Sequence, residues 1–225
     1  MKHKSLVIIG DSAFAEIAYE YFTHDSPYEV AGFAVEKAYL TRDMFMGLPV
    51  VALEEVESRF PKTTHEAFVA LVYGQLNRVR TRLYQAMRAK GYTLANYISS
   101  RAFVWHNVTM GDNVFIFEDN TVQPFVKLGS NIILWSGNHI GHHSSIGSHC
   151  FISSHVVISG FCNIGESCFM GVNASVANNL NVGKDNFIGF GVRIARHTAD
   201  DAVILPTPEV ARETSARAFC KVSSA

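Results

Sequence analysis

The chain has almost no net charge and little cysteine. Its 225 residues include 19 basic and 20 acidic side chains, a formal charge of -1, so no broad field favours nucleic acid or an anionic membrane as a partner. An anionic ligand must therefore be bound by local groups. The few cysteines form no Cys-x-x-Cys pair, which argues against a zinc ribbon or a redox motif. We expect reduced thiols at all four: Cys150, Cys162, Cys168 and Cys220.

A long hydrophobic run is also missing from the start of the chain. Residues 1–22 contain a short apolar run, but acidic and polar residues interrupt it before a signal-peptide core or a membrane span could form. This pattern predicts a soluble, cytoplasmic protein. The length suffices for one large domain or two small ones, and we favour two.

Residues 1–98 alternate between strand-like and helix-like segments. Helical spacing of apolar residues follows the first apolar run. A loop then leads to LPVV and a second helix around LEEVESRF, and residues 77–90 are expected to form an amphipathic helix that stops at Gly91. The alternation indicates a small, Rossmann-like α/β domain with a parallel sheet. Its strands are predicted at three apolar runs: Ser5–Ile9, Val30–Val35 and Phe68–Val72.

From Val104 the hydrophobic period changes to six. Glycine often follows the periodic residue directly, as at Gly141, Gly147, Gly165 and Gly171. A six-residue step with recurrent glycine is typical of a hexapeptide β-helix, in which each hexad forms one flat face and three faces form one coil. All periodic positions are Val, Ile, Leu or Met: Val104, Met110, Ile116, Val122, Leu128, Leu134, Ile140, Ile146, Ile152, Ile158, Ile164, Met170, Val176, Val182, Ile188 and Ile194.

The second half is therefore predicted to be a triangular prism. At about 4.8 Å per coil, residues 104–197 would make roughly five coils. The periodic side chains point inward, and so does the position four residues later, which we expect to be small. Cys150, Cys162 and Cys168 all occupy that second position, where free cysteine packs well.

A short βα domain that opens with VIIGDSAFAEIA, followed by a left-handed parallel hexapeptide β-helix, resembles a known family. These are the bacterial nucleotide-sugar acetyltransferases of the sialic-acid, bacillosamine and perosamine type, which use acetyl-CoA. The resemblance implies a nucleotide-sugar-binding domain at 1–98, an acyltransferase β-helix at 99–198 and a tail at 199–225, which we expect to form a helix. It also implies a homotrimer with sites shared between subunits.

The family's general base is a histidine shortly before an Ile-Gly pair, and the resemblance carries this role to His142. An acidic residue usually follows to orient the base, but His143 stands there, so we include it among the catalytic candidates. A second family histidine, near the acetyl group, aligns with Phe151. His149 or His155 could take its place.

The resemblance further implies a nucleotide-sugar site after the strands of the first domain. It also implies a coenzyme A groove along the later coils, with Leu205-Pro206-Thr207-Pro208 where the family has its adenine segment. We expect Arg78 and Arg82 to lie on a solvated helix face. The substrate candidates are Gly10, Asp11, Ser12, Glu36, Gly74, Asn77 and Arg80. The cofactor candidates are His149, Gly171, Gly189, Gly191, Arg193 and Arg196, with Lys184 as a further phosphate contact.

Metal binding is the main chemical alternative. His143, His149 and His155 are six residues apart, so they lie on successive edges of the prism and cannot converge on one ion within a chain. We therefore expect no metal, although a γ-type carbonic anhydrase would bind one between subunits. Sugar O-acetylation and a non-catalytic assembly role also remain open.

Aromatic residues that follow inward positions are expected at a subunit interface: Trp105, Phe117 and Trp135.

Overall fold

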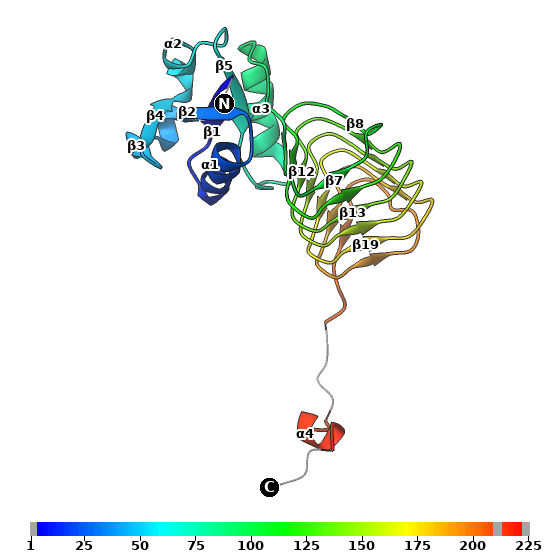
Figure 1. Cartoon of the computed structure of the whole chain (residues 1–225). Coiled ribbons are helices and arrows are strands. Elements are labelled where there is room, and N and C mark those ends of the chain that lie inside the picture. The colour runs from blue at the N-terminus through cyan, green and yellow to red at the C-terminus, as the bar shows by residue number, and fades with distance from the viewer. Residues whose placement is uncertain (1–3, 209–212, 222–225) are drawn as a thin grey trace.

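The computed structural model describes residues 4–208 and 213–221. An α/β domain lies beside one end of a long three-sided prism, and the chain leaves the far end of the prism as a tail (Figure 1). None of the helices in these described ranges is both long and apolar enough to cross a membrane.

The α/β domain contains one five-stranded sheet of order β3-β4-β2-β1-β5. All neighbours are parallel except β3 and β4, which are antiparallel. The strands are β1 Lys4–Ile9, β2 Tyr28–Val35, β3 Met44–Phe45, β4 Leu48–Ala52 and β5 His65–Val69. The helices are α1 Ala13–His24, η1 Lys37–Tyr39, η2 Leu53–Glu55, α2 Val56–Arg59 and α3 Arg78–Ala89.

Two details of this domain differ from the sequence prediction. The segment around LPVV, to which the sequence prediction gave no strand, is strand β4, because Val50 and Ala52 alternate into the core while their backbone pairs with β2. The third predicted strand, Phe68–Val72, lies three residues too late, since β5 is already paired with β1 from His65 and ends at Val69.

The prism is built from two-residue strands that recur every six residues, as predicted. From β6 to β22, each strand pairs in parallel with strands eighteen residues away, as Ile140 does with Ile158. The last strand, β23, pairs with β21 after a longer connection, as Val203 does with Phe187. The strands form a six-stranded, a five-stranded and a seven-stranded face. They are β6 Tyr97–Ile98, β7 Phe103–Val104, β8 Thr109–Met110, β9 Phe115–Ile116, β10 Thr121–Val122, β11 Lys127–Leu128, β12 Ile133–Leu134, β13 His139–Ile140, β14 Ser145–Ile146, β15 Phe151–Ile152, β16 Val157–Ile158, β17 Asn163–Ile164, β18 Phe169–Met170, β19 Ser175–Val176, β20 Asn181–Val182, β21 Phe187–Ile188, β22 Arg193–Ile194 and β23 Val203–Ile204.

The turns between faces form three edges. The domain edge joins the five-stranded to the seven-stranded face and carries His149; the His142 edge joins the six-stranded to the five-stranded face; the third edge carries His155. Most of these turns have a residue of positive φ, including His143 at +58°, His149 at +68° and His155 at +58°. The three histidines therefore project from three different edges, as the spacing predicted.

The prism is filled by the periodic aliphatic side chains, and the second inward position varies more than expected. Cys150, Cys162 and Cys168 are fully buried there, but Ile132 and Leu180 occupy equivalent positions and are not small. Three buried asparagines use the same position to donate hydrogen bonds to turn carbonyl oxygens: Asn120, Asn138 and Asn186.

The β-helix extends one strand beyond each predicted boundary. At the start, β6 pairs with β9, and at the end β23 pairs with β21, so the prism covers 97–204 rather than 99–198. Of the predicted helical tail, α4 Ala216–Phe219 forms a single turn capped by Ser215. Residues 209–212 and 222–225 lie outside the described ranges.

The α/β domain packs on the seven-stranded face through an aromatic core. Phe14 of α1 lies 5.7 Å from Phe115 and 6.0 Å from Trp135 between ring centroids, and Phe117 stacks on Trp135 at 4.5 Å. Phe117 is only 2% exposed. The prediction that Phe117 and Trp135 form a subunit interface is therefore wrong, because the chain's own domain covers them. Trp105 stays 39% exposed.

Candidate active site

A cavity of about 1000 Å³ lies between the α/β domain and the domain edge of the prism. Its walls are the carboxyl ends of β1 and β2, residues of α3, and the turns of the domain edge that contain His149, Glu166 and Lys184. Open α/β sheets bind ligands at the carboxyl ends of their strands. The predicted substrate residues that line it are Gly10, Asp11, Ser12 and Glu36.

The turn after β1 can receive an anion. Gly10 has φ +120°, and a Cβ there would lie 2.9 Å from the carbonyl oxygen of Ala70, so only glycine fits. Ser12 is the N-cap of the twelve-residue α1 and makes no side-chain capping bond, which leaves its hydroxyl and the first N–H groups of the helix facing the cavity. The charge of Asp11 is offset by Arg42, whose Nε lies 3.3 Å from its carboxylate.

Glu36 and Arg82 form a two-pronged ion pair at the cavity wall. The Arg82 Nη1 and Nη2 atoms donate to Glu36 Oε1 at 2.6 Å and Oε2 at 2.9 Å. These bonds hold the pKa of Glu36 below its ordinary value, so it is a carboxylate at neutral pH. Arg78 also lines the cavity and pairs with Asp185 of the prism.

Arg78 and Arg82 are thus functional candidates that the sequence prediction missed. They are four residues apart on α3 and share the helix face that meets the cavity, whereas Arg80 points the opposite way. The spacing of four residues between Arg78 and Arg82 could have indicated that they lie on the same face of the helix. Glu166, Lys184 and Asp185 of the prism also line the cavity, so Lys184 lies beside the substrate candidates and not with a separate coenzyme A groove.

Asn77 and Arg80, predicted as substrate residues, are fully buried and join α3 to the prism instead. The Arg80 guanidinium donates to the carbonyl oxygens of Asn131, His149 and Cys150 and to the Asn77 amide oxygen. Burial lowers the pKa of Arg80 to about 9, so it remains charged at neutral pH. Neither residue lines the cavity, and neither does Gly74.

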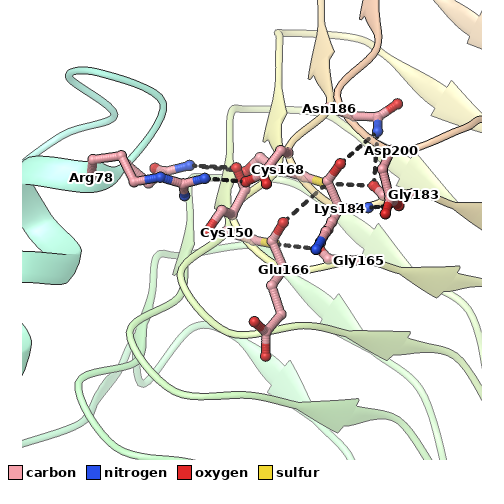
Figure 2. A network of polar contacts seen from close by, with 12 residues as sticks. Arg78, Cys150, Gly165, Glu166, Cys168, Gly183, Lys184, Asn186 and Asp200 are labelled. Carbon is pink, nitrogen blue, oxygen red and sulfur yellow. Dashed lines mark hydrogen bonds and ion pairs between the residues drawn. The ribbon is translucent and has the colours of Figure 1, made fainter.

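A polar network joins successive turns of the domain edge, from Cys150 to Asn186 (Figure 2). The Cys150 thiol donates to the Gly165 carbonyl oxygen at 3.1 Å, and Cys168 donates to Gly183 at 3.1 Å. Burial raises the pKa of the Cys150 thiol, which keeps it protonated. These cysteines are interior packing groups, as the sequence predicted, and they support the turns that carry Glu166 and Lys184.

His149 lies on the domain edge within the cavity wall. Its Nδ1 is 2.9 Å from the Asn131 Nδ2, so the amide donates to the ring, and Tyr84 packs against it with ring centroids 5.5 Å apart. Burial, and then the positive charge of Arg80, lower the pKa of His149. A neutral imidazole with a fixed Nδ1 acceptor suits binding of a polar substrate group. Its position is remote from the other cofactor candidates.

His142 and His143 project together from the His142 edge. Their Nδ1 atoms lie 3.1 Å apart, and both rings are exposed. The backbone N–H of His142 donates to Gln123 Oε1 at 2.9 Å, which fixes the start of the turn. The whole of β14 separates His142 from His149 along the chain, so the predicted base and the cavity lie on two different edges.

The remaining cofactor candidates do not gather in one place within the chain. Gly171 and Gly189 are buried on the third edge, where a Cβ would lie 2.5 Å from the Phe190 nitrogen and 2.9 Å from Pro206 Cδ, respectively. Close stacking of coils therefore explains why these two positions are glycine. Gly191 is an exposed turn residue with φ +64°. Arg193 and Arg196 are exposed at the far end of the prism.

Metal ligation finds no support in the side-chain geometry. No group of three His, Cys, Asp or Glu residues within 4–208 and 213–221 is placed to hold an ion.

Comparison with known proteins identifies the fold. At the level of sequence, no family model and no curated protein matches the chain. A variant of perosamine N-acetyltransferase from Caulobacter crescentus, solved with CoA and GDP-perosamine, superposes with a TM-score of 0.81 at 25% identity, over 91% of this chain and 94% of that one. The acetyltransferase domain of PglB from Neisseria gonorrhoeae FA1090 gives 0.81 at 21% identity, over 92% and 98%. WeeI from Acinetobacter baumannii AYE gives 0.69 at 18% identity, over 92% and 98%.

The architecture is therefore that of the left-handed β-helix acyltransferases. Within this class, the chain has the two-part layout of the nucleotide-sugar N-acetyltransferases of the hexapeptide-repeat family, from the first strand of the α/β domain to the end of the prism. The resemblance drawn from the sequence and the predicted fold class are confirmed.

Proposed function

We propose that the protein is a cytoplasmic, acetyl-CoA-dependent N-acetyltransferase that acts on the amino group of a nucleotide-linked amino sugar. The observation that carries this proposal is the pairing of an anion-receiving cavity on one edge of the prism with an exposed imidazole on the next. Perosamine N-acetyltransferase, of similar fold, was solved with CoA and GDP-perosamine, also in forms in which one histidine is replaced by Asn or by Ala.

The nucleotide-linked sugar is assigned to the cavity. The diphosphate would meet the N–H groups at the start of α1 beside Ser12, where the helix dipole favours negative charge. Glu36, at the end of β2, is the acceptor for hydroxyl or N–H groups of the nucleoside. Arg82 keeps that carboxylate ionised and adds a positive charge at the same wall.

His142 is assigned as the general base. Its Nδ1 faces His143, so Nε2 is the atom available to a substrate. As the sugar nitrogen attacks the thioester carbonyl, a C–N bond forms and the C–S bond breaks; His142 Nε2 takes the proton that the nitrogen loses and returns it to the departing sulfur. The acetyl thioester supplies the activated carbonyl, and a backbone N–H of a turn can stabilise the negative charge on its oxygen.

Coenzyme A is assigned to the His142 edge. Because eighteen residues make one coil, Arg196 follows His142 in the same column, three coils further on, with Gly160 and Asn178 between them. At about 4.8 Å per coil, roughly 14 Å separate the two positions. Exposed Arg193 and Arg196 would meet the phosphates while the thioester reaches His142. Gly191, on the third edge, would reach the same ligand only from a neighbouring chain.

The separation of His142 from the cavity supports a homotrimer in which one chain supplies the cavity and its neighbour supplies the base. Exposed Phe103, Trp105 and Val157 lie on and beside the six-stranded face and would be covered by such a neighbour. Sedimentation at micromolar concentration should give a trimer, and a monomer that retains full activity would contradict shared sites.

The function is tested by presenting the purified protein with acetyl-CoA and UDP-, GDP- and dTDP-linked 3-amino and 4-amino sugars, and measuring thiol release. We expect turnover with at least one amino sugar and none with its hydroxyl counterpart. The His142→Asn variant should lose on the order of 10^2 to 10^4 in turnover while it keeps its oligomeric state. Turnover confined to hydroxyl sugars, or undiminished in His142→Asn, would overturn the proposal.

A further inference from the structure

His143 stands in a stack of three rings along the His142 edge. Its imidazole lies 4.5 Å from the ring centroid of Phe125 at 30° and 4.9 Å from that of Phe161 at 17°. The three residues are eighteen apart and share the positive-φ position of successive coils, with φ +64°, +58° and +58°. The two phenyl rings therefore restrict the imidazole of His143 to one plane.

His142 is held against this stack. Its ring meets Phe161 edge-on, with centroids 5.1 Å apart at 88°, and is nearly perpendicular to the ring of His143. Its other side lies over Gly160, where a Cβ would be only 2.9 Å from His142 Cε1. The contacts leave the imidazole one orientation, in which its Nδ1 is 3.1 Å from the Nδ1 of His143.

At this distance one of the two nitrogens donates and the other accepts. If His142 donates, its Nε2 carries a free lone pair and can accept a proton. If His143 donates, His142 holds its proton on Nε2 and cannot act there as a base. The other groups within bonding or ring contact of the pair are uncharged: the Gln123 amide, Phe125, Phe161 and the Gly160 backbone.

We propose that His143 is a positioning residue that accepts the Nδ1–H of His142 and thereby holds the base in the tautomer with a free Nε2. The Phe125 and Phe161 rings fix His143 for this task. This role rests on the proposed function of His142.

Two substitutions of His143 distinguish its role as a hydrogen-bond acceptor from its role as a stacked ring. His143→Phe keeps a stacked ring and loses the acceptor, and Phe125 and Phe161 already adopt this backbone conformation. His143→Asn keeps an acceptor oxygen close to the position of Nδ1 and loses the ring; Asn179 occupies the same position one coil beyond Phe161 with φ +62°. Both variants should therefore fold, which circular dichroism and sedimentation can verify.

With the best amino sugar of the screen, His143→Phe should lower kcat on the order of 10^2 with both KM values within about twofold, because the base is misoriented while binding is intact. His143→Asn should stay within about threefold of the native kcat. Equal losses in both variants, or full activity of His143→Phe, would overturn the positioning role.

A second measurement does not depend on turnover. In protein labelled with 15N-histidine, the imidazole nitrogen shifts should show a protonated Nδ1 on His142 and an unprotonated Nδ1 on His143, and this pattern should be lost in His143→Phe. A proton on Nε2 of His142 in the native protein would overturn the inference. Inactive native protein with the expected tautomer would instead count against the proposed function alone.

Discussion

The guanidinium of Arg80 on α3 donates a hydrogen bond of 3.0 Å to the carbonyl oxygen of His149, so a helix of the first domain holds the turn that carries the cavity histidine. Replacement of this fully buried side chain in Arg80→Met would remove the donor to the carbonyl oxygens of Asn131 and His149. We expect a loss of about 3 kcal/mol in the free energy of unfolding, which corresponds to a melting temperature lower by roughly 6 to 12 °C.

Arg88→Met is the matched control for this prediction. Arg88 lies on the same helix, but its side chain is exposed and bonds only the Tyr84 hydroxyl, with Asp112 at 3.7 Å. Its loss should cost less than about 1 kcal/mol. Equal melting temperatures for the two variants would show that Arg80 does not join the domains.

The prism was predictable from the sequence because its signal is local and repeated. Aliphatic side chains that recur every six residues are buried together only when the chain forms a three-sided coil. The same periodicity predicted that the three cysteines point into the prism. The α/β domain was predicted less well. Strand β4 was missed because Leu48–Ala52 contains proline and few residues, and its stability comes from pairing with β2 rather than from its own pattern.

The site was predicted in part for a similar reason. Gly10, Ser12 and Glu36 follow strand ends, and strand ends of a parallel sheet meet at one edge. Arg78, Arg80 and Arg82 alternate along one helix, and the sequence does not say which face meets the prism. Phe117 and Trp135 looked like interface residues because nothing in their own hexads reveals that α1 covers them.

Glu36→Gln should weaken binding of the nucleotide-linked sugar. The substitution removes the charge that accepts bonds at the end of β2, and it leaves Arg82 without its partner. Since hydrogen bonds to charged groups contribute about 1.5 to 3 kcal/mol, KM for the sugar nucleotide should rise on the order of tenfold or more while KM for acetyl-CoA stays constant. Steady-state kinetics with each substrate varied in turn measures the difference.

Glu57→Gln serves as the control for the change of charge. Glu57 of α2 pairs with Lys90 and Lys62 and does not line the cavity. Both KM values should remain native in this variant. A parallel rise in both variants would assign the effect to net charge and not to contact with the substrate.

Gly160→Ala should impair catalysis with little effect on stability. The new Cβ would approach His142 Cε1 to 2.9 Å and Nε2 to 3.0 Å, so the His142 side chain, and not the backbone, must give way. A displacement of a few tenths of an ångström at a general base should lower kcat by about tenfold. In Gly74→Ala no atom lies within 4 Å of the added methyl group, so kcat should be native. Unchanged kcat in Gly160→Ala would mean that His142 is not held over this glycine.

Asp25 should make stability depend on acid pH. Burial alone would raise the pKa of Asp25, but hydrogen bonds from the Tyr97 hydroxyl at 2.7 Å and the Ser100 N–H at 2.9 Å outweigh it and lower the pKa below the ordinary 3.8. The folded state therefore favours the carboxylate, and its contribution is complete above pH 3.8 and lost as pH falls through the lower, folded value.

Urea denaturation at a series of pH values from about 6 to about 3 measures this contribution. The midpoint should fall at the acid end in the native protein, and it should fall less steeply in Asp25→Asn, whose side chain does not titrate. Identical slopes for the two proteins would remove Asp25 as a pH-dependent link between α1 and the first turn of the prism.

The pairing of residues eighteen apart also restricts how such a chain can change in length. Gain or loss of one full coil leaves every later residue above its former neighbours, as Ile158 lies above Ile140. Loss of a single hexad between β12 and β13 would keep aliphatic residues at every inward position. It would, however, move His142 from the His142 edge to the third edge of the prism. Replication slippage by six residues would therefore yield a folded but inert protein, and functional chains should vary in steps of eighteen.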